Sequence, residues 1–252
     1  MKNFFWISSM YFKRAFLAPA NYLMIGLPII FMTILYLIDR FMQAQFTYYE
    51  LANIPLANAL NLMTIPMILA FQLFGVDGAA GELHSDLKGP TGARLKVSGI
   101  DERVFYLSVI ASSWSFYSLT GAICIAVGHF VFGIYFASIP LTFLALALLA
   151  LMAQVISIII FYFTKDEKAS GRIGYLFGEI VMGITLLPAL LTNAPKIVSD
   201  ILSWFPVGVG ERLVKATTFG EIMLPVGVLL GMIAVLSCAV FVIGRRKGYD
   251  RI

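Results

Sequence analysis

Six apolar runs, each about as long as a membrane-spanning helix, constrain the fold of this chain more than any other feature. A helix needs about 20 mostly apolar residues to cross the hydrocarbon core of a bilayer. Of the 252 residues, 60% are hydrophobic and only 13% are charged, whereas soluble domains are about a quarter charged. Runs this long exclude an outer-membrane β-barrel, whose strands alternate over about 10 residues. The sequence therefore predicts an all-α integral membrane protein with six transmembrane helices, over residues 20–38, 55–76, 104–127, 141–163, 174–193 and 222–243.

Lysine and arginine are concentrated in alternate loops between these runs. If both termini lie inside, the outer side keeps only four of the 18 basic residues, namely Arg40, Lys196, Arg212 and Lys215. Basic residues accumulate in cytoplasmic loops and set the orientation of a membrane protein. We therefore expect an N-in, C-in, multi-pass protein of a bacterial plasma membrane. The net positive charge reflects this topology and does not indicate nucleic-acid binding.

Three segments outside the runs complete one transmembrane domain over residues 1–252. Residues 1–19 combine aromatic side chains with Lys2, Lys13 and Arg14, which is typical of an interfacial helix lying flat on the inner leaflet. An aromatic flank of the first span is the alternative. Residues 77–103 are expected to form a cytoplasmic loop. Residues 194–221 are too polar and too rich in proline and glycine to span, which predicts short re-entrant or interfacial helices on the outer side, broken at Pro195 and Pro206.

Polar residues inside the runs are candidates for function or for packing. Asn58, Asn61 and Gln72 share one face of the second span at helical spacing. These amides either bond to neighbouring helices or line a substrate pathway, and the sequence leaves both open. Glu179 lies inside the fifth span, either as a carboxylate that meets a proton or substrate or as a paired or snorkelling side chain.

Small residues predict where helices approach closely. Ser108, Ser112 and Ser115 share one face of the third span, and Gly174 and Gly178 form a GxxxG spacing in the fifth. Small side chains of this kind let neighbouring backbones come together in a membrane.

Signatures of enzyme chemistry are absent from the sequence. No GxxxxGK[ST] motif is present, so the chain cannot hold ATP phosphates in a phosphate-binding loop. The pair Glu82 and His84 lacks the second histidine that a zinc site would need, and we expect no metal. Cys124 and Cys238 both fall in apolar runs, which predicts buried, inert thiols. The chain is therefore not expected to be an enzyme by itself, and no catalytic residue is assigned.

The central loop carries a pattern suited to docking. Ala93, Leu95 and Val97 alternate with Arg94 and Lys96 and are followed by the breaker Ser98-Gly99. A short surface helix here would present both apolar and basic side chains to a cytoplasmic partner.

Three elements in order along the chain resemble the type-2 ATP-binding-cassette (ABC) permease family. They are the amphipathic helix ending in Lys13-Arg14, Glu82 with the stretch from Gly92 to Phe105, and Trp204-Phe205-Pro206 with Glu211-Arg212. The resemblance implies that two permease subunits pair, as a homodimer or heterodimer. Two separate ATPase subunits would hold ATP and Mg²⁺, and this chain would bind no cofactor. A coupling helix would contact the ATPase through Glu82, Gly92, Ala93, Arg94, Leu95, Lys96 and Val97.

The same resemblance implies a pathway lined by the first, second and fifth helices. Its candidate residues are Met32, Asn58, Asn61, Gln72 and Glu179, with an outer gate at Pro188, Trp204, Phe205 and Pro206. The expected function is export of a hydrophobic or amphipathic substrate, a peptide in preference to a drug or lipid, by alternating access. The chain departs from the family pattern in three places: Ser98-Gly99 replaces a proline-containing turn, residues 84–90 are rearranged, and Ser108 stands near a usual basic position.

Two other functions fit the sequence. An ion-coupled secondary transporter would use Glu179 as its proton carrier and need no ATPase. A membrane sensor or immunity protein would use the charged central loop only to bind a signalling partner.

Overall fold

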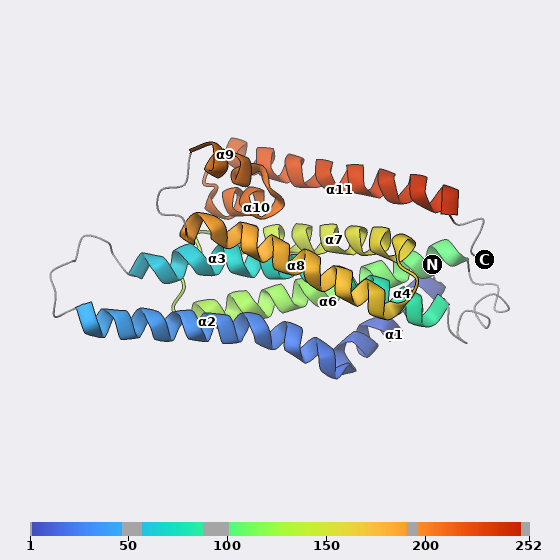
Figure 1. Ribbon diagram of the computed structural model, residues 1–252, viewed down its shortest axis with the longest axis horizontal. Helices are drawn as coiled ribbons and strands as arrows, with labels where there is room; N and C mark the ends of the chain where they lie inside the picture. Colours follow the sequence, from blue (N-terminus) through green and yellow to red (C-terminus); the bar gives the residue numbers. More distant parts are fainter. Residues whose placement is uncertain (1, 47–56, 88–100, 191–195, 248–252) are drawn as a thin grey trace.

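The computed structural model describes residues 2–46, 57–87, 101–190 and 196–247 (Figure 1). Every regular element in these ranges is an α-helix. The predicted coupling helix, Gly92 to Val97, lies outside the described residues. The helices are α1 Lys2–Leu17, α2 Pro19–Phe46, α3 Ala57–Leu73, α4 Val76–Leu87, α6 Glu102–Phe130, α7 Ile139–Phe163, α8 Glu167–Leu190, α9 Lys196–Trp204, α10 Pro206–Lys215 and α11 Phe219–Lys247.

The long helices lie side by side and reverse direction from one to the next (Figure 1). Helix α1 lies at the end of the bundle where α4, α7 and α11 finish, which we call the α1 end. Helices α9 and α10 lie at the opposite end, which we call the α10 end. Within the described ranges, five stretches are long and apolar enough to cross a membrane: Met24–Phe41, Met63–Leu87, Val104–Phe130, Ile139–Phe163 and Phe219–Arg245.

The sixth predicted span, residues 174–193, falls on α8, which is not among these five stretches. Helix α8 begins earlier than expected, at Glu167, and its first two turns carry Lys168 and Arg172. Glu179 interrupts its apolar sequence farther along. In Figure 1, α8 nevertheless runs beside α3 and α4 from one end of the bundle to the other.

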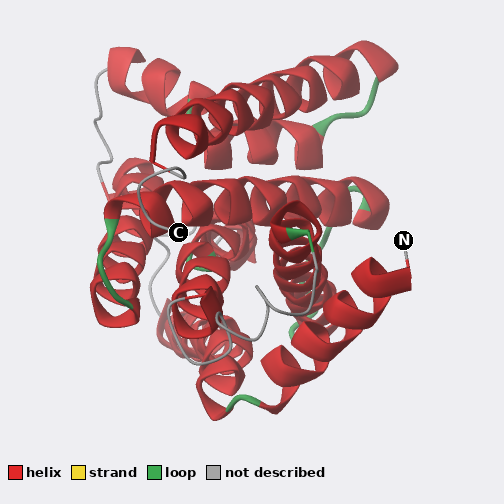
Figure 2. Cartoon of the chain, turned by 90° about the vertical axis from the view of Figure 1, so that its right-hand side faces the viewer, coloured by secondary structure: helices red, strands yellow, loops and turns green. Residues whose placement is uncertain are grey.

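Helix α7 forms the centre of the bundle. It packs against α3, α4, α6, α10 and α11. Figure 2 views the same bundle from the α1 end. Leu146, Leu149 and Ala153 are fully buried along it. Its first turn begins in the way expected of a well-defined helix, with Ser138 accepting a hydrogen bond from the amide of Leu141 and with proline in the first turn.

Helix α1 is separate from α2, because the chain turns at Ala18 and α2 begins at Pro19. The side chain of Asn21 fixes this corner by donating to the carbonyl oxygen of Ala15 at 2.7 Å. Ile7, Tyr11 and Ala15, spaced four residues apart, are buried on one face of α1, whereas Trp6 is exposed. This helix is therefore amphipathic and packs on α6. Its position at a membrane surface stays a prediction.

The boundary between the second span and the central loop was predicted wrongly. The predicted span 55–76 contains a break at Phe74-Gly75, and residues 77–87, expected in the loop, continue as helix α4. Gly78, Ala79 and Ala80 are small enough for α4 to lie close to its neighbours, so the chain stays packed in the bundle.

One of the two cysteine predictions was also wrong. Cys124 is buried in α6, but Cys238 is exposed on α11. Among the described residues, α11 packs mainly along α7 and α10, and much of its apolar surface faces outward. An apolar sequence therefore did not imply burial inside the protein.

Candidate functional site

Helix α4 joins α1 through a buried carboxylate at the α1 end. Asp86 has only 7% of its surface exposed, and its Oδ2 atom accepts hydrogen bonds from the Tyr11 hydroxyl and from Nη1 of Arg14, the latter at 2.7 Å. Nη2 of Arg14 reaches Ser85 Oγ at 3.4 Å. Tyr11 and Arg14 are three residues apart and so share one face of α1. We call Tyr11, Arg14, Ser85 and Asp86 the α1–α4 clamp.

The clamp keeps Tyr11 as a hydrogen-bond donor. Burial, followed by the hydrogen bond to Asp86, raises the pKa of Tyr11 well above its ordinary value. The phenol therefore stays protonated and donates to the carboxylate. Arg14 is about half exposed, so its charge remains partly solvated, whereas Asp86 is desolvated and depends on both donors.

Glu82, one turn before Asp86, is the only residue of the predicted ATPase-coupling set that falls within the described ranges. Its Oε2 atom is buried and has no hydrogen-bond partner among the described residues. Residues four apart on a helix lie on the same face, so Glu82 and Asp86 both face toward α1. Glu82 as a whole is half-buried, and its role in ATPase coupling stays a prediction.

The opposite side of α4 is joined to α7 by polar contacts. Gln154 donates from Nε2 to the carbonyl oxygen of Gly75 at 3.1 Å, and Ser157 Oγ accepts from the amide of Ala80 at 2.7 Å. Nε2 of His84 lies 2.7 Å from Oγ1 of Thr164. The α7 residues recur at helical spacing, so they form a stripe that follows α4 along its length. We call these contacts the α4–α7 seam.

The break between α3 and α4 lies at the start of this seam. The side chain of Gln154 supplies a hydrogen bond to the Gly75 carbonyl, which faces the break. A β-carbon on Gly75 would lie 2.8 Å from the ring of Tyr117, and one on Gly178 would lie 2.5 Å from the ring of Phe74. Glycine is therefore needed at both positions for α6 and α8 to pack against the break.

Together these contacts make α4 a rigid connector. It is bonded to α1 on one face and to α7 on the other, and it ends at Leu87, directly before residues 88–100. A hydrophobic cluster surrounds the connector, contributed by α1, α4, α6 and α7. Movement of the segment after Leu87 would therefore be transmitted to α1 and α7. The described residues contain no group of three or more His, Cys, Asp or Glu side chains that could bind a metal.

The predicted pathway residues whose side chains the structure describes do not share one surface. Met32 and Gln72 are buried in the core, with Gln72 against Gly121 of α6. Glu179 instead lies exposed on α8. Asn58 and Asn61 are in α3, and their side chains are outside what the structure describes. Gln72 lies between helices, but its Oε1 atom is buried without a hydrogen-bond partner among the described residues, so both interpretations of the polar stripe stay open.

The predicted outer-gate residues lie at the α10 end. Pro188 is in α8, and its side chain lies outside the described parts. Trp204 ends α9, Phe205 precedes α10 and Pro206 begins it, as the proline break predicted. The guanidinium of Arg212 lies 4.7 Å from the centre of the Trp204 ring. Helix α10 packs into the bundle, where Gly210 lies against Leu69 and Leu149.

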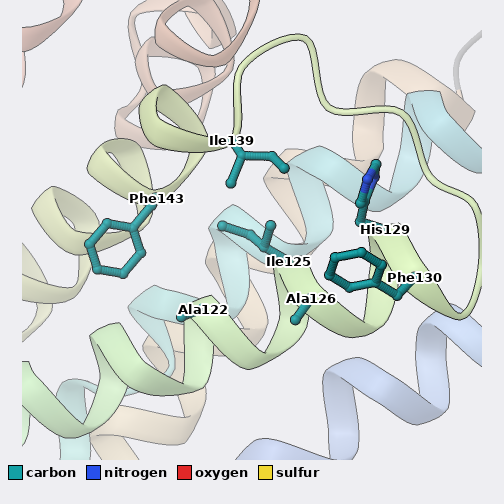
Figure 3. A pocket seen from close by; sticks show the side chains of 7 residues that line it. All are labelled: Ala122, Ile125, Ala126, His129, Phe130, Ile139 and Phe143. Atoms are coloured by element: carbon teal, nitrogen blue, oxygen red, sulfur yellow. The ribbon is translucent and has the colours of Figure 1, made fainter.

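A shallow apolar pocket lies near this end, between α6 and α7. Figure 3 shows Ile125, Phe130 and Phe143 around it, with His129 at its rim. His129 Nδ1 lies 3.3 Å from the carbonyl oxygen of Ile134. The pocket has almost no polar lining and is open to the surroundings, as expected for a surface that faces lipid.

Sequence reasoning missed most of the clamp and the seam. Tyr11, Arg14, Asp86, Gln154 and Ser157 were not assigned to a site. The available signal was the continuation of helical spacing from Gly75 to Asp86, which places Glu82 and Asp86 on one face of a helix. Treating residues 77–103 as a loop concealed it.

Comparison with known proteins identifies no relative of this chain, since no family model, no curated protein and no solved structure matches it. Function must therefore be inferred from these contacts and from the sequence.

Proposed function

We propose that this chain is the membrane subunit of an ATP-driven exporter. It would move a hydrophobic or amphipathic substrate out of the cell, a peptide in preference to a drug or lipid. Two copies, or this chain and a related one, would form the pathway, and two separate ATPase subunits would bind ATP and Mg²⁺. The resemblance to type-2 ABC permeases is the origin of this proposal, and the arrangement of the helices supports it.

The distribution of charge supports an α1 end that faces the cytoplasm. Among the described residues, Lys13, Arg14, Lys165, Lys168 and Arg245 all belong to helix ends or turns at the α1 end. The basic residues of α9 and α10 and Arg40 lie toward the other end. The excess of basic residues is cytoplasmic in membrane proteins. With α8 as a sixth crossing, this gives the N-in, C-in topology that an ATPase docking at residues 88–100 requires.

The α1–α4 clamp is the observation that carries the proposal. An ATPase acting on residues 88–100 would push on the end of α4. Because Asp86 bonds Tyr11 and Arg14, and because the seam bonds α4 to α7, the push would reach both the surface helix and the bundle centre. A charged loop that served only to anchor the protein would not need a connector bonded on two faces.

Charge reversal in the docking segment tests the proposal. We expect Arg94→Glu with Lys96→Glu to abolish transport while the protein still inserts into the membrane, because the two cations would contact the ATPase. The matched control is Lys165→Glu with Lys168→Glu, which reverses the same charge at the same end in another turn. ATP hydrolysis and transport are measured together in reconstituted vesicles with a co-purified subunit that carries GxxxxGK[ST]. A Gly/Ser linker in place of residues 92–97 that preserves both assembly and transport would contradict the assignment.

An ion-coupled secondary transporter is the second candidate, favoured by the exposed position of Glu179 on α8. The two functions differ in their energy source. Transport that stops when ATP is depleted and continues when an uncoupler collapses the proton gradient supports the exporter. The reverse result supports the secondary transporter.

A further inference from the structure

We infer that the exposed face of α8 around Glu179 binds a cationic amphiphile, so that the cargo of the proposed exporter carries a positive charge next to an apolar body. This inference rests on the proposed function for its role in transport, but the binding site itself is argued from α8.

Glu179 is near the middle of a helix that runs the length of the bundle. Twelve residues separate it from Glu167 and eleven from Leu190. At 1.5 Å per residue, the carboxylate is about 16–18 Å from either end of α8 along the helix axis. The exposed Arg172, in the second turn of α8, is seven residues from Glu179, or about 10 Å along the helix axis. If α8 spans the membrane with Arg172 among the headgroups, the Glu179 carboxylate lies beside the apolar region.

Glu179 faces away from its own bundle. The inward face of α8 is formed by Gly174, Gly178 and Val181, which are buried, and Gly178 lies against Phe74. Glu179 is exposed on the other side, together with Tyr175, Leu176 and Ile180, each with roughly half of its surface exposed. The exposed face is therefore a carboxylate set in an aromatic and aliphatic surface.

Among the described residues, no cation is paired with this carboxylate. The ion pairs of Arg14 with Asp86 and of Lys215 with Glu211 do not involve Glu179. None of the six apolar runs contains a lysine or an arginine, and the nearest basic residue on α8, Arg172, is seven residues away. A second copy related by an axis along the membrane normal would place the same residues at the same depth. It would therefore bring a second carboxylate, not a partner for the first.

A ligand that satisfies this face must combine two properties. An unpaired carboxylate in an apolar environment is costly, and a charge of opposite sign removes the cost. The surrounding tyrosine, leucine and isoleucine side chains favour an apolar body and would reject a strongly hydrated ion. Charge complementarity thus selects a lipophilic cation over an anionic or neutral lipid.

Two ions of the same shape and opposite charge test the inference directly. Purified protein in lipid nanodiscs is titrated with tetraphenylphosphonium and with tetraphenylborate. We expect tetraphenylphosphonium to bind, Glu179→Gln to weaken it about tenfold or more, and Glu179→Asp to retain most of the affinity. Glu167→Gln, at the exposed start of the same helix, is the matched control and should change nothing. Equal affinity of wild type and Glu179→Gln for tetraphenylphosphonium overturns the inference.

A measurement on the unaltered protein covers the case in which the variants fold poorly. Dicyclohexylcarbodiimide modifies accessible carboxyl groups in apolar surroundings, and the modified residue is located by mass spectrometry. We expect Glu179 to be modified and to be protected by tetraphenylphosphonium but not by tetraphenylborate. Lack of modification, or modification that tetraphenylphosphonium does not reduce, contradicts the inference.

These outcomes are separate from the fate of the exporter proposal. Binding that depends on Glu179 in a protein that assembles with no ATPase would keep the cation site and reject the ATP-driven mechanism. ATP-coupled transport without any role of Glu179 in cation binding would keep the ATP-driven mechanism and reject the cation site.

Discussion

Helices α7 and α11 are both long and strongly apolar, yet they occupy opposite environments. In the apolar stretch of α7, 61% of the residues are buried, compared with 11% in that of α11. The two helices also differ in their polar contacts. Gln154 of α7 bonds to Gly75 in the helix break, and Ser157 bonds to Ala80 of α4. Glu221, in the first turn of α11, accepts hydrogen bonds from Thr217 and Thr218 in the turn just before its own helix.

The comparison shows what apolar sequence does and does not encode in such a chain. Hydrophobicity marks both helices as candidates to cross a membrane, because lipid and protein interior are equally apolar. The polar side chains decide which face meets protein, since each needs a partner that lipid cannot supply. Substitutions at the α1–α4 clamp and the α4–α7 seam should therefore affect stability far more than substitutions on α11.

The largest effect is expected at the clamp. Asp86→Ala leaves the buried Tyr11 hydroxyl and the half-exposed Arg14 without their acceptor, and should lower the free energy of unfolding by about 2–3 kcal/mol. Unfolding by denaturant in detergent micelles measures the change. Asp200→Ala, an exposed position on α9, is the control. Equal effects of the two variants would show that the clamp contributes no stability.

The second-largest effect on stability is expected where α8 packs against the helix break. Gly178→Ala places a β-carbon 2.5 Å from Phe74, so the ring or the helix must shift, at a cost of about 1–3 kcal/mol. Gly183→Ala on the same helix meets nothing within 4 Å and should be neutral or stabilising. Thermal unfolding of both variants checks the difference. If the two glycines tolerate alanine equally well, α8 is not packed on the break as described.

A smaller effect is expected in the seam. Gln154→Leu removes the hydrogen bond to the Gly75 carbonyl and should cost about 1 kcal/mol, because polar contacts between membrane helices are individually modest. Leu151→Met, on the same helix and without a polar contact to lose, provides the control. Hydrogen exchange at residues 74–80 should increase in Gln154→Leu alone. Unchanged exchange would mean that Gln154 does not hold the break.

The smallest effect is expected on α11. Val235 is 70% exposed, so Val235→Ala should change the free energy of unfolding by less than about 0.5 kcal/mol. The same denaturant titration used for Asp86→Ala gives the value. A loss of 2 kcal/mol or more would place Val235 in a protein interface and would remove the contrast with α7.

The sequence was sufficient to predict the all-helical architecture, the approximate limits of most long helices, the separate N-terminal helix and the proline break before α10. These features depend on local composition, on prolines and on runs of apolar residues. It was not sufficient to predict α4, because a helix rich in glycine, alanine and acidic residues resembles a loop until its partners are known. Asp86 is stable inside the protein because Tyr11 and Arg14, 75 and 72 positions earlier in the chain, both donate to it.

The candidate site was predictable only in part for the same reason. Glu82 was assigned to ATPase coupling, but its position near Tyr11 and Arg14 of α1 depends on contacts between distant segments. Gln72 and Glu179 were placed on one pathway because the family resemblance implies a pathway lined by the first, second and fifth helices. In the structure the two residues lie in different surroundings. Gln72 is buried against Gly121, whereas Glu179 is exposed on the face of α8 opposite Gly178.

The most direct test of α4 as the connector is the number of substrate molecules transported per ATP hydrolysed, measured in vesicles that contain the Asp86→Asn variant and its ATPase. Asparagine keeps the size of the side chain but weakens the bonds to Tyr11 and Arg14. We predict that the ATPase still assembles and hydrolyses ATP, while transport per ATP falls several-fold. A ratio equal to that of the unaltered protein, at unchanged assembly, would contradict the role of the clamp in coupling.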